Sequence, residues 1–238
     1  NVFTQTRVPG PACALRQTQS VPPPYINNTA VPGAVVFSIY NNLDPAANAN
    51  ALTTFFLGGL TQTQMMQRVS PTFVSIWIGN NDVLGAATNS ANGGDSSLVT
   101  PVATFTARYD AMLDSVDVVS PQGGVLLGVV KVTAAPFFSA GATYWAIKNG
   151  LVPGAPALPD SFFVDNNCAP SGPVPGIPGA RGDSVLVGFP YGGLLLGTAA
   201  AGVRATLSCS DTIPQIVAPA EVIKLLSSVA QYNAHIAA

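Results

Sequence analysis

Two apolar runs separated by an amphipathic segment constrain the fold of this chain more than any other feature. Residues 73–78, FVSIWI, form the first run, and residues 125–133, VLLGVVKVT, form the second. Both runs have strand length, and the weak alternation in the second is typical of a strand covered on both faces. Between them, apolar residues at helical spacing draw one stripe: Phe105, Tyr109, Met112, Leu113 and Val116. The order strand, helix, strand predicts a parallel sheet with helices on its two sides.

Other segments extend this pattern. Residues 51–69 are predicted to form a helix interrupted by a Gly-Gly pair, and residues 185–190 a further strand. The last helix is expected to begin at Pro219, with Glu221 in its first turn, where both residue types are favoured. Asn233 falls on the apolar face of that helix, so it should be buried and hydrogen-bonded. Residues 1–26 are a Pro-rich loop, and residues 149–184 have the Pro, Gly and Asn content of a loop insertion.

The composition indicates one well-buried domain and excludes some partners. Only 8% of the 238 residues are charged, against roughly 25% in ordinary soluble domains, while 48% are hydrophobic. We therefore expect a single domain over residues 1–238. The formal net charge of -2, without a Lys/Arg cluster, argues against nucleic-acid binding. The chain contains no stretch of about 20 uninterrupted apolar residues, so no transmembrane helix is predicted.

The cysteines point to no metal site. Cys13, Cys168 and Cys209 lack the spacing of metal ligands, and the chain has only 1 histidine. The many amides and hydroxyls in place of charges suggest an extracytoplasmic protein, in which Cys168 and Cys209 could form a disulfide and leave Cys13 over. Three reduced, buried thiols are the alternative. The sequence leaves both open.

The turn Gly79-Asn80-Asn81-Asp82 follows the first apolar run directly. Open α/β sheets place their functional sites in the loops after the carboxyl ends of parallel strands. A glycine allows a tight turn there, and an Asn amide offers uncharged N–H donors suited to a developing oxyanion. The alternative is a purely structural turn, because Asn and Asp tolerate unusual backbone angles and cap helices.

The same turn closely resembles block III, Gly-x-Asn-Asp, of the SGNH or GDSL family of esterases and lipases. Three further segments resemble family elements in the family's order. NNTAVPGA, residues 27–34, is similar to block II, in which Gly33 takes the place of the oxyanion glycine. ARYDAMLDSV followed by GGVLLGVVKVTAAPFF resembles a helix and strand of the family, and EVIKLLSSVAQYNAHI resembles its late helix with a Tyr-Asn pair.

This resemblance implies a three-layer α/β/α sandwich with a mainly parallel sheet of flavodoxin-like topology. It also implies a secreted or cell-surface serine esterase or lipase that acts on a small, lipid or carbohydrate ester through an acyl-enzyme, with no metal and no organic cofactor. Gly33 and Asn81 would donate to the oxyanion, and Asp82 would organise the loop. The signal peptide would lie outside this sequence.

The sequence departs from the family at the nucleophile and the base. No Gly-Asp-Ser-Leu block precedes residue 27, and the two Gly-Asp-Ser triplets, at residues 94–96 and 182–184, follow block III and are interpreted as chance turns. His235 has Tyr232 three residues before it in place of aspartate, and its helical position predicts exposure to solvent. Arg181-Gly182-Asp183 matches an adhesion tripeptide too short to be informative. Neither a nucleophile nor a base is identified.

Two hypotheses follow. In the first, the chain is an SGNH-like domain truncated at both ends, with the serine strand and the Asp-x-x-His loop outside it; the chain alone would be inactive. In the second, it is a non-catalytic extracellular binding or structural protein that keeps the sandwich without the triad and associates through apolar patches. Open edges left by missing strands would also allow self-association.

Overall fold

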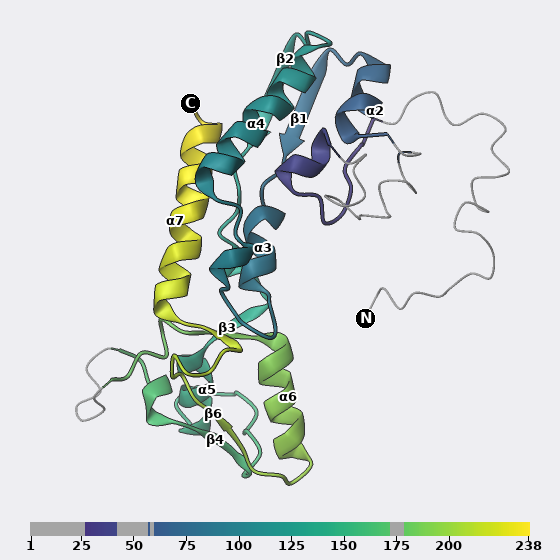
Figure 1. Cartoon of the computed structure of the whole chain (residues 1–238). Coiled ribbons are helices and arrows are strands. Elements are labelled where there is room, and N and C mark those ends of the chain that lie inside the picture. The colour runs from purple at the N-terminus through teal and green to yellow at the C-terminus, as the bar shows by residue number, and fades with distance from the viewer. Residues whose placement is uncertain (1–26, 42–56, 58–59, 172–178) are drawn as a thin grey trace, which may run out of the picture. The chain divides into compact units, whose positions relative to one another are not determined.

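A computed structural model describes residues 27–41, 57, 60–171 and 179–238 (Figure 1). The fold is mixed α/β, with helices and short strands alternating along the chain. No helix among the described residues is long and apolar enough to cross a membrane. The chain divides into two compact units. The first contains Asn1–Ile78 and Thr106–Leu127, and the second contains Gly79–Phe105 and Gly128–Ala238.

The first unit is built on two parallel strands, which lie side by side in Figure 1. Phe73 of β1 lies opposite Gly123 of β2, and the register continues to Trp77 and Leu127. The Gln67 side chain of α2 donates to the Ser115 carbonyl of α4 at 2.7 Å, which ties these two helices together. The elements of this unit are η1 (Val36–Ile39), α2 (Gln62–Val69), β1 (Phe73–Trp77), β2 (Gly123–Leu127) and most of α4 (Val102–Asp117).

The helical predictions in this region are confirmed where the structure describes them. α4 covers the predicted stripe, of which Leu113 is partly buried and the other four residues are buried: Phe105, Tyr109, Met112 and Val116. α2 begins after Thr61, whose hydroxyl accepts from the Gln64 N–H at 3.0 Å while Gln64 returns a bond to the Thr61 N–H. This reciprocal cap fixes where the helix begins. Residues 51–56 and 58–59 of the predicted helix lie outside the described residues.

The predicted burial of the two apolar runs is wrong. Phe73 is 63% exposed and Trp77 is 59% exposed, and the partner strand also exposes Val125, Leu126 and Leu127. Among the described residues β1 and β2 pair only with each other. A two-stranded sheet offers too little neighbouring surface to cover both of its faces, so large apolar side chains remain in contact with solvent.

The second strand, predicted to extend to Thr133, ends at Leu127 as β2. Beyond Leu127 the main-chain N–H groups donate hydrogen bonds to side chains instead of to a neighbouring strand. The Val129 N–H donates to the Asn233 side chain at 2.7 Å, and the Val130 N–H donates to the Asn80 side chain at 3.0 Å. The two side-chain amides accept from N–H groups that, in a longer strand, would donate to a neighbouring strand. The chain then forms η3 (Val132–Ala134).

One part of the second unit is a cluster of helices packed around a shared set of buried apolar side chains. α3, η2, η3 and α7 pack against one another, and Val83, Val132, Leu225 and Val229 are buried there. The predicted start of the last helix is confirmed: Pro219 is its first residue, and the Glu221 carboxylate accepts from the Ala218 N–H at 2.6 Å. The bounds are α3 (Asn81–Ala87), η2 (Ser96–Leu98) and α7 (Pro219–Ile236).

The rest of the second unit holds two small sheets. The strands β3 and β7 pair with β5 in antiparallel fashion, and β4 pairs with β6 in parallel. The strand predicted over residues 185–190 ends at Gly188, because Pro190 lies in the first turn of α6. The bounds are β3 (Phe138–Ala140), α5 (Gly141–Lys148), β4 (Phe162–Val164), η4 (Asn166–Cys168), β5 (Leu186–Gly188), α6 (Phe189–Ala200), β6 (Ala205–Leu207) and β7 (Ile216–Val217).

A disulfide joins Cys168 to Cys209 inside the core of these sheets, across a sequence separation of 41 residues. Both cysteines are buried, beside Phe162 and Leu207. The sequence left open a disulfide or reduced thiols, and the structure shows the disulfide between Cys168 and Cys209. Cys13 lies outside the described residues. The described part of the predicted insertion, residues 149–171 and 179–184, is largely irregular and contains only β4 and η4.

Candidate functional site

Gly79 turns the chain between β1 and α3. Its φ of +107° lies in a region that side chains rarely adopt. A Cβ at this position would lie 2.7 Å from Val129 Cγ2 and 2.9 Å from Phe105 Cε2, so the neighbouring side chains also leave no room for one. The position therefore requires glycine for two independent reasons.

Asp82 anchors the turn from within. Its side chain is 1% exposed, and one carboxylate oxygen accepts from the Thr100 hydroxyl at 2.8 Å. The main chain makes two further bonds, from the Asp82 N–H to the Gly79 carbonyl at 3.2 Å and from the Thr100 N–H to the Asp82 carbonyl at 2.9 Å. A buried carboxylate needs hydrogen bonds to offset its desolvation, and these bonds tie Asp82 to Thr100 and Gly79. The role of Asp82 in organising an oxyanion loop stays a prediction.

Two asparagine side chains clamp the segment that follows β2. Asn233 of α7 accepts from the Val129 N–H at 2.7 Å and donates to the Val129 carbonyl at 2.9 Å, so one amide satisfies both polar groups of one residue. Asn80 accepts from the neighbouring Val130 N–H at 3.0 Å. The predicted hydrogen bonding of Asn233 is confirmed, whereas the residue is partly buried instead of fully buried. Asn80 holds the main chain at Val130, a role that the motif does not indicate because residue 80 is its unspecified position.

Tyr232 closes the same network from α7. Its ring stacks on Phe105 with centroids 3.8 Å apart and planes 10° apart, and its hydroxyl donates to the Thr100 carbonyl. Burial raises the pKa of Tyr232 well above its usual range, and the negative charge of Asp82 adds to the rise. The hydroxyl is therefore held protonated as a donor. Thr100 thus joins Asp82 to Tyr232.

Asn81 is the first residue of α3 and is partly buried. Gly33 lies in a turn with φ of +79°, closed by a bond from the Ala34 N–H to the Val31 carbonyl at 3.2 Å. Gly33 belongs to the first unit, whereas Asn81 and Asp82 belong to the second. The assignment of Gly33 to block II, and its pairing with Asn81 at one oxyanion, stay predictions.

The two Gly-Asp-Ser triplets are engaged in local structure. Asp95 caps η2 by accepting from the Ser97 N–H at 2.9 Å and from its hydroxyl at 2.7 Å. Asp183 accepts from the Ser171 N–H at 3.2 Å and from the Ser171 hydroxyl, which lowers the pKa of the Asp183 carboxyl. Neither triplet directly follows a strand in the part of the chain that the structure describes. This agrees with their interpretation as turns.

The remaining candidates also have structural roles or positions. Arg181 pairs with Asp211 at 2.8 Å and donates from Nε to the Cys209 carbonyl at 2.6 Å, which holds the loop beside the disulfide. His235 lies in the last turn of α7 and is partly buried, not exposed as its helical position predicts. Within the described residues, no group of three or more His, Cys, Asp or Glu side chains forms a candidate metal site.

Comparison with known proteins gives no family for this chain: no protein-family model matches it, and neither a curated protein nor a solved structure was found to be similar. The site is therefore interpreted from its own geometry. That geometry is a turn after a strand in which the uncharged residues Gly79, Asn80 and Asn81 are followed by the buried, hydrogen-bonded Asp82.

Proposed function

We propose that this chain is part of an SGNH-type ester hydrolase in which Gly33 and Asn81 donate N–H groups to the oxyanion of an ester undergoing attack. A serine supplied by polypeptide outside these 238 residues would attack the carbonyl and form an acyl-enzyme, which water then hydrolyses. The substrate class is a carboxylic ester of small-molecule, lipid or carbohydrate origin. Neither a metal nor an organic cofactor takes part.

One observation carries the proposal: the turn at residues 79–82 is fixed far more strongly than a connecting turn requires. Gly79 has no room for a side chain, and the buried Asp82 is hydrogen-bonded to Thr100 at 2.8 Å. An oxyanion donor contributes most when its position is set before the reaction begins. The packing around Gly79 and Asp82 supports such a role for the intervening Asn81.

The proposal includes a finer architecture and a location. The mixed α/β fold with a parallel β1–β2 pair is compatible with a three-layer α/β/α sandwich of flavodoxin-like topology, in which further strands complete the sheet. The buried Cys168–Cys209 disulfide supports a secreted or cell-surface protein, because such bonds persist in oxidising compartments.

The complete reading frame that contains this chain provides the test. We expect it to encode a Gly-Asp-Ser-Leu block upstream and an Asp-x-x-His block downstream, and its product to hydrolyse short p-nitrophenyl esters. The 238-residue chain alone should not hydrolyse them. A complete reading frame that lacks both blocks would contradict the proposal. A complete product without esterase activity would also contradict it.

A non-catalytic binding or structural protein is the second candidate. The exposure of large apolar side chains on β1 and β2, with Phe73 at 63%, favours it, because exposed apolar surface often marks an interaction site. A complete product that folds, lacks esterase activity and associates with itself or another protein through these strands would support this candidate over the first.

A further inference from the structure

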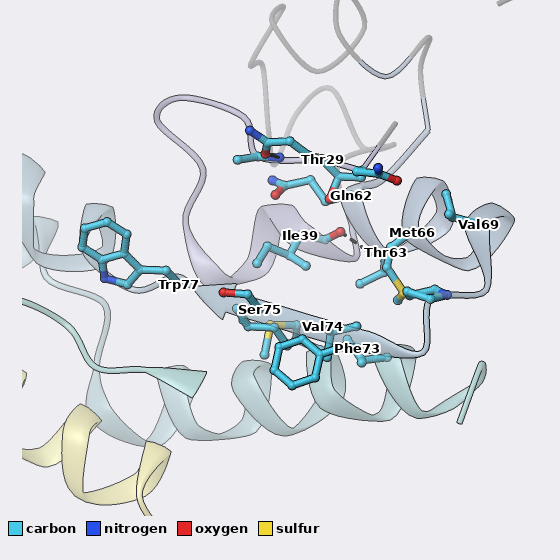
Figure 2. Close-up of a pocket in the computed structure, with 17 residues that line it drawn as sticks. Thr29, Ile39, Gln62, Thr63, Met66, Val69, Phe73, Val74, Ser75 and Trp77 are labelled. Atoms are coloured by element: carbon cyan, nitrogen blue, oxygen red, sulfur yellow. Dashed lines mark hydrogen bonds between the residues drawn. The ribbon is translucent and has the colours of Figure 1, made fainter. Parts of the chain in front are cut away.

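A cavity of about 510 Å³ lies within the first unit, along β1. All five residues of the strand, from Phe73 to Trp77, line it, and the opposite wall consists of residues 27–30 together with Gln62, Thr63, Met66 and Val69 of α2. Figure 2 shows Thr29 and Gln62 on one side of the cavity and Phe73, Val74 and Ser75 on the other, with Ile39 between them. Its volume is within the usual range of ligand pockets, about 300–1,000 Å³.

The lining shows that this cavity follows the edge of the strand. Successive side chains of a strand point to opposite faces of the sheet, so five consecutive residues can line one cavity only where it runs along the edge. The Thr72 carbonyl accepts from the Gln122 N–H at 2.8 Å, on the β2 side. Because main-chain groups alternate between the two edges, those of Phe73 and Ser75 point away from β2 and toward the cavity.

The chemistry of the lining selects an uncharged ligand. None of the described residues that line the cavity is charged. Asn27, Asn28, Gln62 and Thr63 provide amides and a hydroxyl, while Met66 and Ile39 provide apolar surface. A charged group placed here would lose its hydration without an ionic partner, which is costly. An uncharged group with its own donors and acceptors would be satisfied by the strand edge and the amides.

From this geometry we propose that the cavity binds an extended, uncharged segment of another polypeptide, which adds to β1 as a further strand. Addition of a strand to a sheet edge uses main-chain hydrogen bonds for affinity and pockets for alternate side chains. A segment of about five residues spans roughly 17 Å, which matches the length of β1. The bound strand would also cover Phe73, which is 63% exposed.

The walls of the cavity argue against a second copy as the occupant. Residues 27–30 and α2 stand opposite the edge of β1 across the cavity. A second copy that offered its own β1 would bring the same wall with it, and the two walls would collide. A single peptide strand has no such obstacle.

The test uses the whole chain and fluorescence anisotropy with a fluorescein-labelled blocked peptide, Thr-Val-Thr-Ile-Thr-Val. Two N-methylated forms are compared, one methylated at the odd residues and one at the even residues. A strand that pairs along one edge uses alternate N–H groups, so one form should bind like the parent and the other at least tenfold more weakly. Equal binding of all three peptides, or no binding of the parent at about 1 mM, would overturn the proposal.

Two variants of the chain give an independent test. Ser75→Pro removes the N–H that points to the cavity and, at an edge position, should leave the β1–β2 pairing in place. Ser75→Ala keeps that N–H and serves as the matched control. We expect at least a tenfold loss of peptide binding for the proline variant and unchanged binding for the alanine variant. Equal binding by both would contradict main-chain recognition; if Ser75→Pro does not fold, the methylated peptides decide. Sedimentation that shows a dimer unaffected by the peptide would assign the edge to a second copy.

Discussion

Replacing Gly79 with alanine is expected to lower the free energy of unfolding by about 2–4 kcal/mol. The substitution forces a side chain onto a backbone with φ of +107° and places its Cβ 2.7 Å from Val129 Cγ2. Urea denaturation followed by circular dichroism measures the change. Gly85→Ala, in the middle of α3 with open space around it, is the control and should stabilise the chain by about 0.5–1 kcal/mol. Equal effects of the two substitutions would show that Gly79 is not constrained.

Tyr232 should make the chain sensitive to alkaline pH. Its pKa in the folded chain is raised by burial and by Asp82, so the folded protein keeps a proton that the unfolded chain loses above about pH 10. Stability is therefore fully present below pH 10 and falls as the pH rises. Burial also raises the pKa of Tyr144 and Tyr191, which add to the fall.

Tyr232→Phe is expected to reduce this alkaline loss more than Tyr191→Phe does, because Tyr232 has the larger shift. The free energies of unfolding of both variants at pH 8 and pH 10.5 measure the difference. An alkaline loss unchanged by Tyr232→Phe would mean that its hydroxyl is accessible to hydroxide in the folded state.

The contact between α7 and the segment after β2 depends on the Asn233 amide. Asn233→Leu keeps the approximate volume of the side chain but leaves the Val129 N–H and carbonyl without their partner, so we expect a loss of about 2–4 kcal/mol. Gln231→Leu, on the exposed side of the same helix, should change stability by no more than about 0.5 kcal/mol. Thermal unfolding of the two variants compares them directly. If both lose the same stability, helix propensity and not the amide clamp explains the effect.

The elements that could be predicted from sequence are those whose signal is local. The stripe from Phe105 to Val116 predicted α4, and Pro219 with Glu221 predicted the start of α7, because spacing and capping act within a few residues. The end of β2 could not be predicted. It depends on Asn80 and Asn233, which lie 50 and 104 residues away from their partners, Val130 and Val129.

The candidate site shows the same division. The motif identified Gly79, Asn81 and Asp82 as one turn, and the structure adds that Asp82 is buried, while its role in organising the loop stays a prediction. Thr100 and Tyr232 complete the network around Asp82. Tyr232 belongs to the Tyr-Asn pair of the late helix, but that resemblance does not indicate its contact with Thr100, and no pattern in its own segment singles out Thr100. The exposure of Phe73 and Trp77 was missed because apolarity indicates a tendency to be buried, whereas burial depends on which other strands and helices are present.

The disulfide should dominate the stability of the second unit. Cys168 and Cys209 are separated by 41 residues, and closing a loop of that length is worth about 4 kcal/mol in the chain-entropy estimate. The double variant Cys168→Ser/Cys209→Ser should therefore unfold at a lower guanidinium concentration than the parent chain. Added dithiothreitol should destabilise the parent to a similar degree and leave the double variant unchanged. A parent chain insensitive to the reductant would contradict this account.

The catalytic role of Asn81 is tested most directly by the kcat of the complete gene product on short p-nitrophenyl esters. Asn81→Ala removes the proposed oxyanion donor without touching the Asp82–Thr100 bond, and we expect kcat to fall by about 10²–10³. Asn166→Ala, at an exposed position of the second unit, should leave kcat unchanged. An Asn81→Ala enzyme that is folded and as active as the parent would contradict the proposed function.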